Sequence, residues 1–230
     1  MRYAEPLEMI RFTQKIRKAS LFLALTLVAF VLLEGVAMFL YPGGTWGNRS
    51  SLGHDFFGNY FCDLTASKAL NGKTNPGAPY AKAGMFVFTL GLIPFWILIT
   101  GVLRQLRARL SKLILGLGSI SSVAAALVPF VPSTQYGNLH PVLVFLAGIP
   151  GILAGGLSTY GLVKTKSGSR IPARLAVITV VLIAIDGVLY AVHVATGYEV
   201  HPIVLPGLQK MGAASLVAWM LSAAVLGRRR

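Results

Sequence analysis

Most side chains of this sequence that could act as acids, bases or metal ligands fall at one end of its apolar segments. The chain is 55% hydrophobic and only 12% charged, so such a cluster calls for an explanation. Imidazole and carboxylate groups serve as general acids and bases and as ligands of transition metals. The members of the cluster are His54, His140, His193, His201, Asp55, Asp63 and Glu199. The pattern locates a candidate site without naming its reaction.

A metal centre is one chemistry that these residues could support. Three or four ligands about 2.0 to 2.2 Å from one zinc ion, with a position left open, could activate water. The sequence has no HExxH motif, so zinc-dependent hydrolysis of a lipid is an alternative and not the leading hypothesis. Haem held between His140 and His193 is a second alternative. The candidate metal ligands are His54, Asp63, His140, His193 and His201.

Three charged residues lie inside apolar segments, where an ionised group is costly. They are Glu34, Asp186 and Lys210. Asp186 is followed by Tyr190 and His193 at i+4 and i+7, a spacing that places all three on one face of a helix. We expect this face to point into the bundle and Lys210 to pair with Glu34 or Asp186. Either a ligand or proton site, or a buried pair that only fixes helix packing, would fit this pattern.

Six apolar runs must position these groups. Each is about 20 residues long, enough to cross roughly 30 Å of hydrocarbon as a helix. Together with a mean hydropathy of +0.69, they predict an all-α, polytopic membrane protein with a six-helix bundle in a single domain, residues 1–230. The predicted spans are 20–41, 83–103, 111–131, 140–163, 174–195 and 204–227.

The basic residues predict the orientation of the bundle. Sixteen of the 21 Lys and Arg side chains flank one side of the predicted spans and five flank the other. Because Lys and Arg resist translocation, we expect both termini in the cytoplasm of a cell whose inner or plasma membrane holds the protein. Residues 1–19 then form a cytoplasmic interfacial segment. The net charge of +14 is explained by this topology, so no nucleic-acid partner is inferred.

The one long segment outside the spans, residues 42–82, is predicted to be an ordered extracytoplasmic cap. A structureless loop of that length is uncommon, which favours folding over the helix ends. Turn motifs open it at Tyr41-Pro42-Gly43-Gly44 and recur at Asn71-Gly72. The aromatic-rich run 56–64 is typical of a short helix.

The same loop resembles a known family. The motifs are Tyr41-Pro42-Gly43-Gly44-Thr45, Gly58-Asn59-Tyr60-Phe61-Cys62-Asp63-Leu64, Asn71-Gly72, Asn75-Pro76, Pro132 with Leu139-His140, and Leu208-Gln209-Lys210 with Trp219. With them the chain resembles the bacterial and archaeal six-helix membrane family catalogued as domain of unknown function 998. It is more distantly similar to FRAG/DRAM/SFK-type membrane proteins. The resemblance implies a fold and topology but no reaction, and the chain departs from it at Gln209 and Lys210, where an arginine is expected.

These observations predict an outward-facing polar pocket beneath the cap. The leading hypothesis is a protein that binds a lipid headgroup or small ligand, for sensing, transport or lipid organisation. Membrane lipids are its expected partners. Whether the protein is an enzyme, and its oligomeric state, stay open. The predicted pocket residues are Glu34, His54, Asp63, His140, Asp186, Tyr190, His193 and Lys210.

Overall fold

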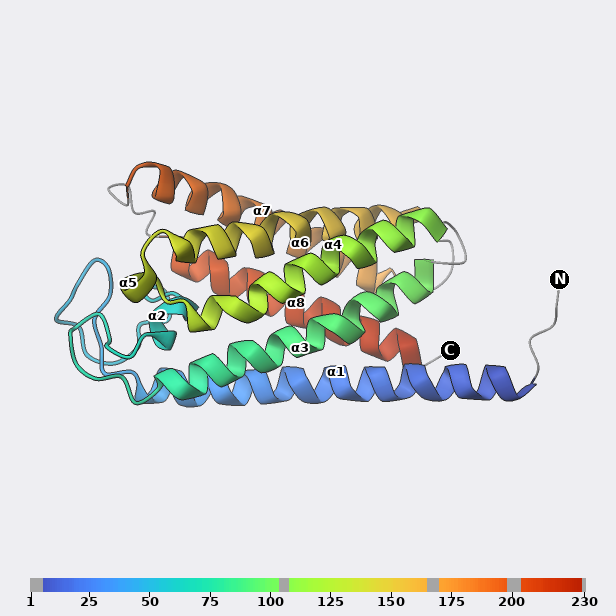
Figure 1. Ribbon diagram of the computed structural model, residues 1–230, viewed down its shortest axis with the longest axis horizontal. Coiled ribbons are helices and arrows are strands. Elements are labelled where there is room, and N and C mark those ends of the chain that lie inside the picture. The colour runs from blue at the N-terminus through green and yellow to red at the C-terminus, as the bar shows by residue number, and fades with distance from the viewer. Residues whose placement is uncertain (1–5, 104–107, 165–169, 198–203, 229–230) are drawn as a thin grey trace.

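Six long helices and two short ones make up most of the chain (Figure 1). The computed structural model describes residues 6–103, 108–164, 170–197 and 204–228, and it contains no β-strand among them. The long helices are α1 (Pro6–Leu40), α3 (Ala78–Leu103), α4 (Ala108–Leu127), α6 (Leu139–Lys164), α7 (Ile171–Ala195) and α8 (Leu205–Arg228). The short ones are α2 (Phe61–Thr65) and α5 (Ser133–Tyr136), and a 3-10 turn, η1 (Val128–Phe130), extends α4.

All six long helices are apolar enough to cross a membrane, which confirms the prediction of a multi-pass, all-α bundle. Large apolar side chains are exposed along the outside, as at Phe39 and Val123, where a soluble protein would carry polar groups. Helices satisfy every backbone group internally and so suit hydrocarbon. The spans are Gln14–Leu40, Ala78–Leu103, Ala108–Phe130, Leu139–Lys164, Ile171–Ala195 and Leu205–Leu226.

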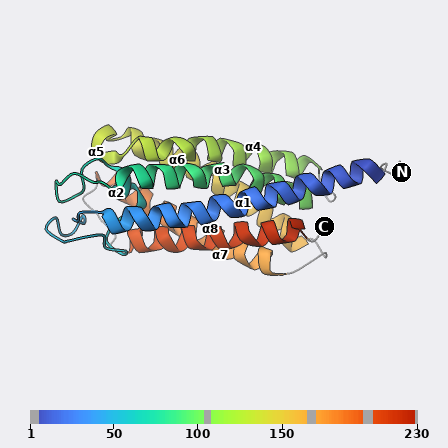
Figure 2. The same ribbon diagram turned by 90° about the horizontal axis from the view of Figure 1, so that it is seen from below.

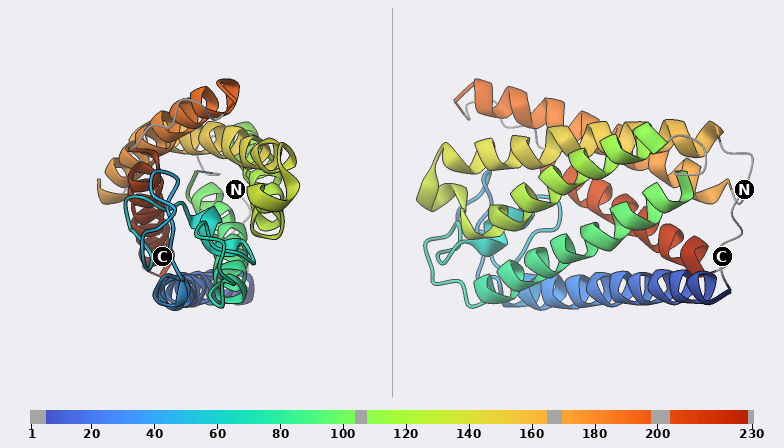
Figure 3. Two further views of the ribbon diagram at one scale, coloured as in Figure 1. Left: turned by 90° about the vertical axis from the view of Figure 1, so that its left-hand side faces the viewer. Right: turned by 45° about the vertical axis from the view of Figure 1, so that its right-hand side comes forward.

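The long helices form a closed ring in chain order. Each packs against the long helix before it and the one after it, and α8 returns to pack against α1. Figure 2 shows α1 between α3 and α8, and the end view in Figure 3 shows the long helices arranged as a ring. Consecutive long helices are antiparallel (Figure 1).

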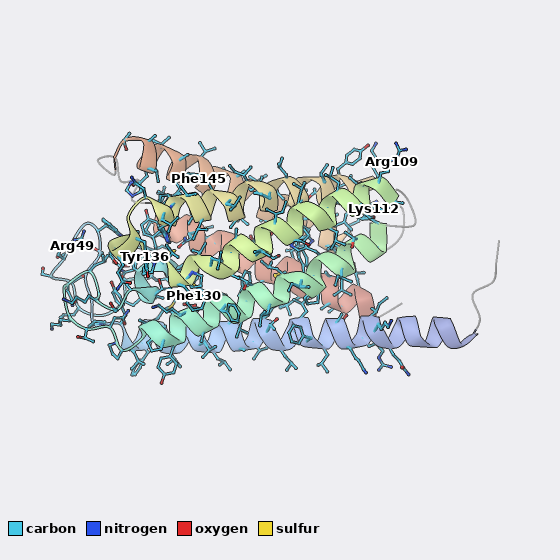
Figure 4. The ribbon with its side chains drawn as sticks, viewed as in Figure 1. Arg49, Arg109, Lys112, Phe130, Tyr136 and Phe145 are labelled. Atoms are coloured by element: carbon cyan, nitrogen blue, oxygen red, sulfur yellow. The ribbon has the colours of Figure 1, made fainter. Side chains whose placement is uncertain are left out.

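Residues 41–77 with α2, together with α5, gather at one end of the ring, here called the capped end (Figure 1). The start of α1 and the end of α8 lie at the opposite end. Arg109 and Lys112 lie at that opposite end, whereas Arg49 lies in the cap (Figure 4). The helix α1 continues without a break from Pro6 into its span, and its 35 residues give a length of about 52 Å.

An aromatic cluster fills the interior of the ring in the half away from the cap. Phe95 and Trp219 meet edge to face with ring centroids 4.9 Å apart, and Trp96 completes the cluster. Gly118 of α4 makes room for this packing, because a Cβ there would lie 2.5 Å from the Trp96 ring. These rings pack tightly across the interior of the ring at that level.

Candidate functional site

Two glycines fix the start of the cap. Gly43 and Gly44 have φ angles of 127° and 88°, which L side chains rarely adopt. A Cβ on Gly43 would lie 2.2 Å from the Ser51 carbonyl oxygen, and one on Gly44 would lie 2.3 Å from the Asn71 nitrogen. At these two positions, neighbouring backbone segments of the cap approach each other at a distance that only glycine permits.

The fully buried Asn59 joins separate parts of the cap. Its Nδ2 donates to the Gly44 carbonyl at 2.8 Å, and its Oδ1 accepts from the Asp55 backbone N–H at 3.0 Å. Asn75 acts in the same way further along, donating from Nδ2 to the Leu64 and Ala66 carbonyls at 2.9 and 3.0 Å. Buried amides with several partners hold an irregular segment in one conformation.

Asp63 accepts hydrogen bonds from both sides. Its Oδ2 accepts from the Tyr60 backbone N–H at 2.8 Å, and its Oδ1 accepts from Trp46 Nε1 at 3.2 Å. Burial raises the pKa of Asp63 to about 6, although its hydrogen bonds favour the ionised form. Its carboxylate is both part of the cap and part of the cavity wall described below.

The start of α8 fastens the cap to the bundle. Gln209 Oε1 accepts from the Phe61 backbone N–H at 3.0 Å, at the first residue of α2. Lys210 Nζ donates to the Asn59 carbonyl and, at 3.4 Å, to the Pro206 carbonyl, and it lies 5.1 Å from the centroid of the Phe56 ring. Both carboxylate oxygens of Glu34 are buried without a hydrogen-bond partner. Oδ1 of Asp186 is likewise buried without a partner, so neither expected pairing of Lys210 is shown, and the Asn59 and Pro206 carbonyls accept from its ammonium group instead.

A cavity of about 670 Å³ lies beneath the cap, between the capped halves of α6, α7 and α8. Its polar wall includes Asp63, His140, Asp186, Tyr190, His193 and Gln209. Its apolar wall includes Val144, Phe145, Ile149, Ile152 and Val188. The arrangement resembles ligand sites in general, where a few polar groups converge in a mostly apolar pocket.

A second cavity of about 320 Å³ adjoins the first toward the middle of the ring. The two share a wall that includes Cys62, Gly148, Asp186 and Gln209, and all six long helices contribute to the second one. Trp96 and Trp219 line it at the side of the aromatic cluster. Asp186 thus lies where the two spaces meet.

The first cavity reaches the outer surface between α6 and α7. Ile149 of α6 and Val188 of α7 both line it, yet they are 57% and 64% exposed. Both residues lie well inside their spans, at the depth of the hydrocarbon. A molecule in the bilayer could therefore enter from the side.

Five of the predicted pocket residues line this cavity: Asp63, His140, Asp186, Tyr190 and His193. The stripe of three on α7 lies on one wall, where helical spacing places it. His140 is fixed by a 2.6 Å hydrogen bond between Nδ1 and the Val131 carbonyl. Trp46, Tyr60, Cys62 and Gln209 also line the cavity, although the sequence analysis did not select them. For Tyr60, Cys62 and Gln209, their place in the resembling loop and helix-start motifs was the available signal.

The other predicted residues lie elsewhere. Glu34 is 3% exposed and faces α3, where a Cβ on Gly84 would lie 2.9 Å from its Oε1. His54 packs edge-on against Tyr41 with ring centroids 6.2 Å apart, and burial lowers its pKa to about 4. Lys210 is directed at the cap, and His201 lies outside the described residues.

The arrangement of possible metal ligands is loose. Within the described part of the chain, no group of three or more His, Cys, Asp or Glu side chains is placed to hold one metal ion.

Comparison with protein-family models, curated proteins and solved structures finds no match to this chain. The functional argument therefore depends on the cavity itself.

Proposed function

We propose that this chain is a membrane protein that binds a lipid or lipid-like amphiphile in the cavity beneath its cap. One observation carries the proposal: a single cavity has polar side chains beneath the cap, apolar side chains along its helices, and a side opening at Ile149 and Val188. A polar head would lie near Asp186 and His193. Its hydrocarbon chain would lie between α6 and α7.

Such a site would serve to sense, move or organise a lipid. When the hydrocarbon chain of a lipid moves from the bilayer into this cavity, it exchanges one apolar environment for another. Hydrophobic burial therefore contributes little to the net binding affinity. Selectivity must then come from the polar head. The cap matters for this reason, because it excludes water and strengthens electrostatic interactions with the head.

We propose further that the cap lies outside the cytoplasm and that both termini lie within it. Lys15, Arg17, Lys18, Arg109, Lys112, Lys164 and Arg170 flank the end of the ring opposite the cap. Because Lys and Arg resist translocation, that end should stay in the cytoplasm. An impermeant thiol reagent added to intact cells should label Lys73→Cys in the cap and leave Lys112→Cys unlabelled. The reverse pattern would overturn this orientation.

The resemblance of the cap motifs to domain of unknown function 998 is in keeping with this proposal. Tyr41, Gly43, Gly44, Asn59 and Asn75 all take part in ordering the cap. A motif that specifies the cap would be shared by proteins that need the same cover over a membrane cavity. Kinship with that family is therefore part of the proposal.

Two glycines of α6 provide a matched test. Gly148 lines both cavities and a Cβ there meets no atom within 4 Å, so Gly148→Leu should fill the space without disturbing the helix. Gly156 lies two turns further along and also has an open position, but it lines neither cavity. Gly156→Leu is thus the control, with the same gain in helix propensity.

The measurement is native mass spectrometry of the protein released from lipid nanodiscs. We expect an amphiphile to remain on the wild type and on Gly156→Leu and to be lost from Gly148→Leu. Equal lipid occupancy in all three proteins would contradict the proposal. Stoichiometric zinc that is lost in both His140→Ala and His193→Ala would favour the hydrolase alternative, and a haem absorption band would favour the haem alternative.

A further inference from the structure

We infer that the ligand head carries a positive charge, as a primary amine or a quaternary ammonium group, and that Asp186 recognises it. This inference rests on the proposed function and specifies the class of amphiphile. Four observations support it: the charges on the cavity wall, the balance of buried charges, the state of the Asp186 carboxylate and the aromatic rings beside it.

The charges on the wall are of one sign. The charged residues among the described side chains that line the two cavities are Asp63 and Asp186, with no Lys or Arg. This is unusual in a chain with 21 Lys and Arg against seven Asp and Glu. A fatty acid or phosphate head would meet two carboxylates and no basic partner, whereas a cation would meet complementary charge.

The buried charges near the cavity are also unbalanced. Glu34, Asp63 and Asp186 all lie within electrostatic range of Cys62 of α2, so the three carboxyl groups share this end of the bundle. Among the described side chains, Lys210 is the buried Lys or Arg at this end, and its ammonium is held by the Asn59 carbonyl. Three carboxyl groups beside one ammonium are costly in a medium of low dielectric constant, and a bound cation would reduce that cost.

Of the three carboxyl groups, Asp186 is the one available to a ligand. Oδ1 of Asp186 is buried and has no hydrogen-bond partner, and the residue lines both cavities. Asp63 already accepts from Trp46 and Tyr60, while Glu34 lies behind the wall against α3. A buried carboxylate oxygen without a donor, placed on a cavity wall, is suited to an ammonium group.

Aromatic side chains line the same cavity as this carboxylate. Tyr190 lies one helical turn after Asp186, and its ring centroid is 5.6 Å from that of Phe145 on α6. Tyr60 interacts electrostatically with both Asp186 and Tyr190, which places it at the same part of the cavity. Ring faces within about 6 Å stabilise ammonium groups, and quaternary ammonium is often bound by several rings with a carboxylate.

The test uses three probes with the same hydrocarbon chain: dodecyltrimethylammonium, dodecanoate and dodecanol. Each is titrated below its micelle concentration into protein in neutral-lipid nanodiscs, and binding is followed by tryptophan fluorescence, since Trp46 lines the cavity. We expect the ammonium probe to bind at least about tenfold more tightly than dodecanoate, a difference of about 1.4 kcal/mol. Equal affinity for the two would overturn the inference.

Two carboxylate variants separate recognition from general stability. Asp186→Asn should weaken the ammonium probe about tenfold or more and leave dodecanol unchanged. Glu34→Gln removes a carboxylate that is buried at the same end but lines neither cavity, so it should weaken ammonium binding clearly less than Asp186→Asn does. If the two variants weaken ammonium binding equally, Asp186 is not the recognition group.

The remaining outcomes distinguish failure of the inference from failure of the proposed function. If all three probes bind equally and Gly148→Leu abolishes their binding, the amphiphile site stands and charge selection fails. If no probe binds, both fail. If choline, which has no long chain, binds as tightly as dodecyltrimethylammonium, the ligand is a soluble amine: the charge inference holds and the amphiphile proposal is overturned.

Discussion

The cap and the cavity beneath it treat buried polar groups in opposite ways. In the cap, Asn59 and Asn75 use both ends of their side-chain amides, and each hydrogen bond reaches a different part of the loop. In the helices nearby, Glu34 and Asp186 present buried carboxylate oxygens that have no partner. Stability accounts for the first arrangement. It does not account for the second, because an orphaned acceptor costs free energy.

This contrast separates structural polar residues from functional ones. The sequence motifs of the cap hold it in one conformation. The residues that line the cavity come mainly from the helices. Mutations should therefore divide into two groups: changes in the cap should lower stability, and changes of helix carboxylates should preserve or raise stability while altering binding. Four predictions test this division.

The largest loss of stability is expected for Asn59→Ala. The substitution leaves the Gly44 carbonyl and the Asp55 N–H without their partner and removes one donor to Asp63. At about 1 to 3 kcal/mol for each buried group, the loss should be roughly 3 kcal/mol or more. Thermal unfolding in nanodiscs measures it. Asn48→Ala, in an exposed turn of the same cap, is the control and should cost far less.

The second largest loss of stability is expected for Gly44→Ala. Its φ of 88° would strain an alanine, and the added Cβ would lie 2.3 Å from the Asn71 nitrogen. Gly53→Ala is the matched control, since Gly53 has a φ of 67° but open space around it. The control should show only backbone strain, about 1 to 2 kcal/mol. If both variants lose the same stability, the close approach at Gly44 does not hold the cap.

Glu34→Gln should change the free energy of unfolding in the opposite direction from the two cap variants. Replacing a buried carboxylate that has no partner with a neutral amide should leave the free energy of unfolding unchanged or raise it by about 1 kcal/mol. The thermal midpoint in nanodiscs should stay constant or increase. A large decrease would show that Glu34 has a structural partner in the membrane and that the contrast between cap and helices is wrong.

The sequence predicted the features that neighbouring residues determine, and it failed for those that depend on residues far apart in the sequence. The spans follow from local composition, and the shared face of Asp186, Tyr190 and His193 follows from helical spacing, so both could be read from short windows. The destination of Lys210 could not. It donates to the Asn59 carbonyl, 151 residues away in sequence, and such a contact depends on how α8 is rotated against the cap.

The same reasoning explains the misplacement of Glu34. Its depth in the membrane was visible in the sequence, but its direction was not, because α1 is apolar around most of its surface. The small residue Gly84 decides the direction by leaving space on α3. Trp46 and Gln209 were missed for a related reason. Trp46 reaches the cavity through the folded cap, where it donates to Asp63, and Gln209 lines the cavity from α8, where it accepts from the Phe61 backbone N–H.

The last prediction concerns pH, where two groups of the cap oppose each other in the wild type. Burial raises the pKa of Asp63 from 3.8 to about 6, so the folded state binds more protons than the unfolded state between those values. Its contribution to the free energy of unfolding therefore falls as pH rises from about 4 to 6. Burial lowers the pKa of His54 from 6.5 to about 4, so its contribution rises with pH across nearly the same window.

In the wild type these two contributions oppose each other. We expect the thermal midpoint of His54→Gln to decrease, relative to the wild type, as pH rises from about 4 to 6, because only the Asp63 contribution remains. That of Asp63→Asn should increase over the same range. The difference in slope between the two variants is the quantity to measure, since all other titrating groups contribute equally to both. Parallel slopes would show that neither group changes its pKa on folding, and that the cap does not bury them as the structure indicates.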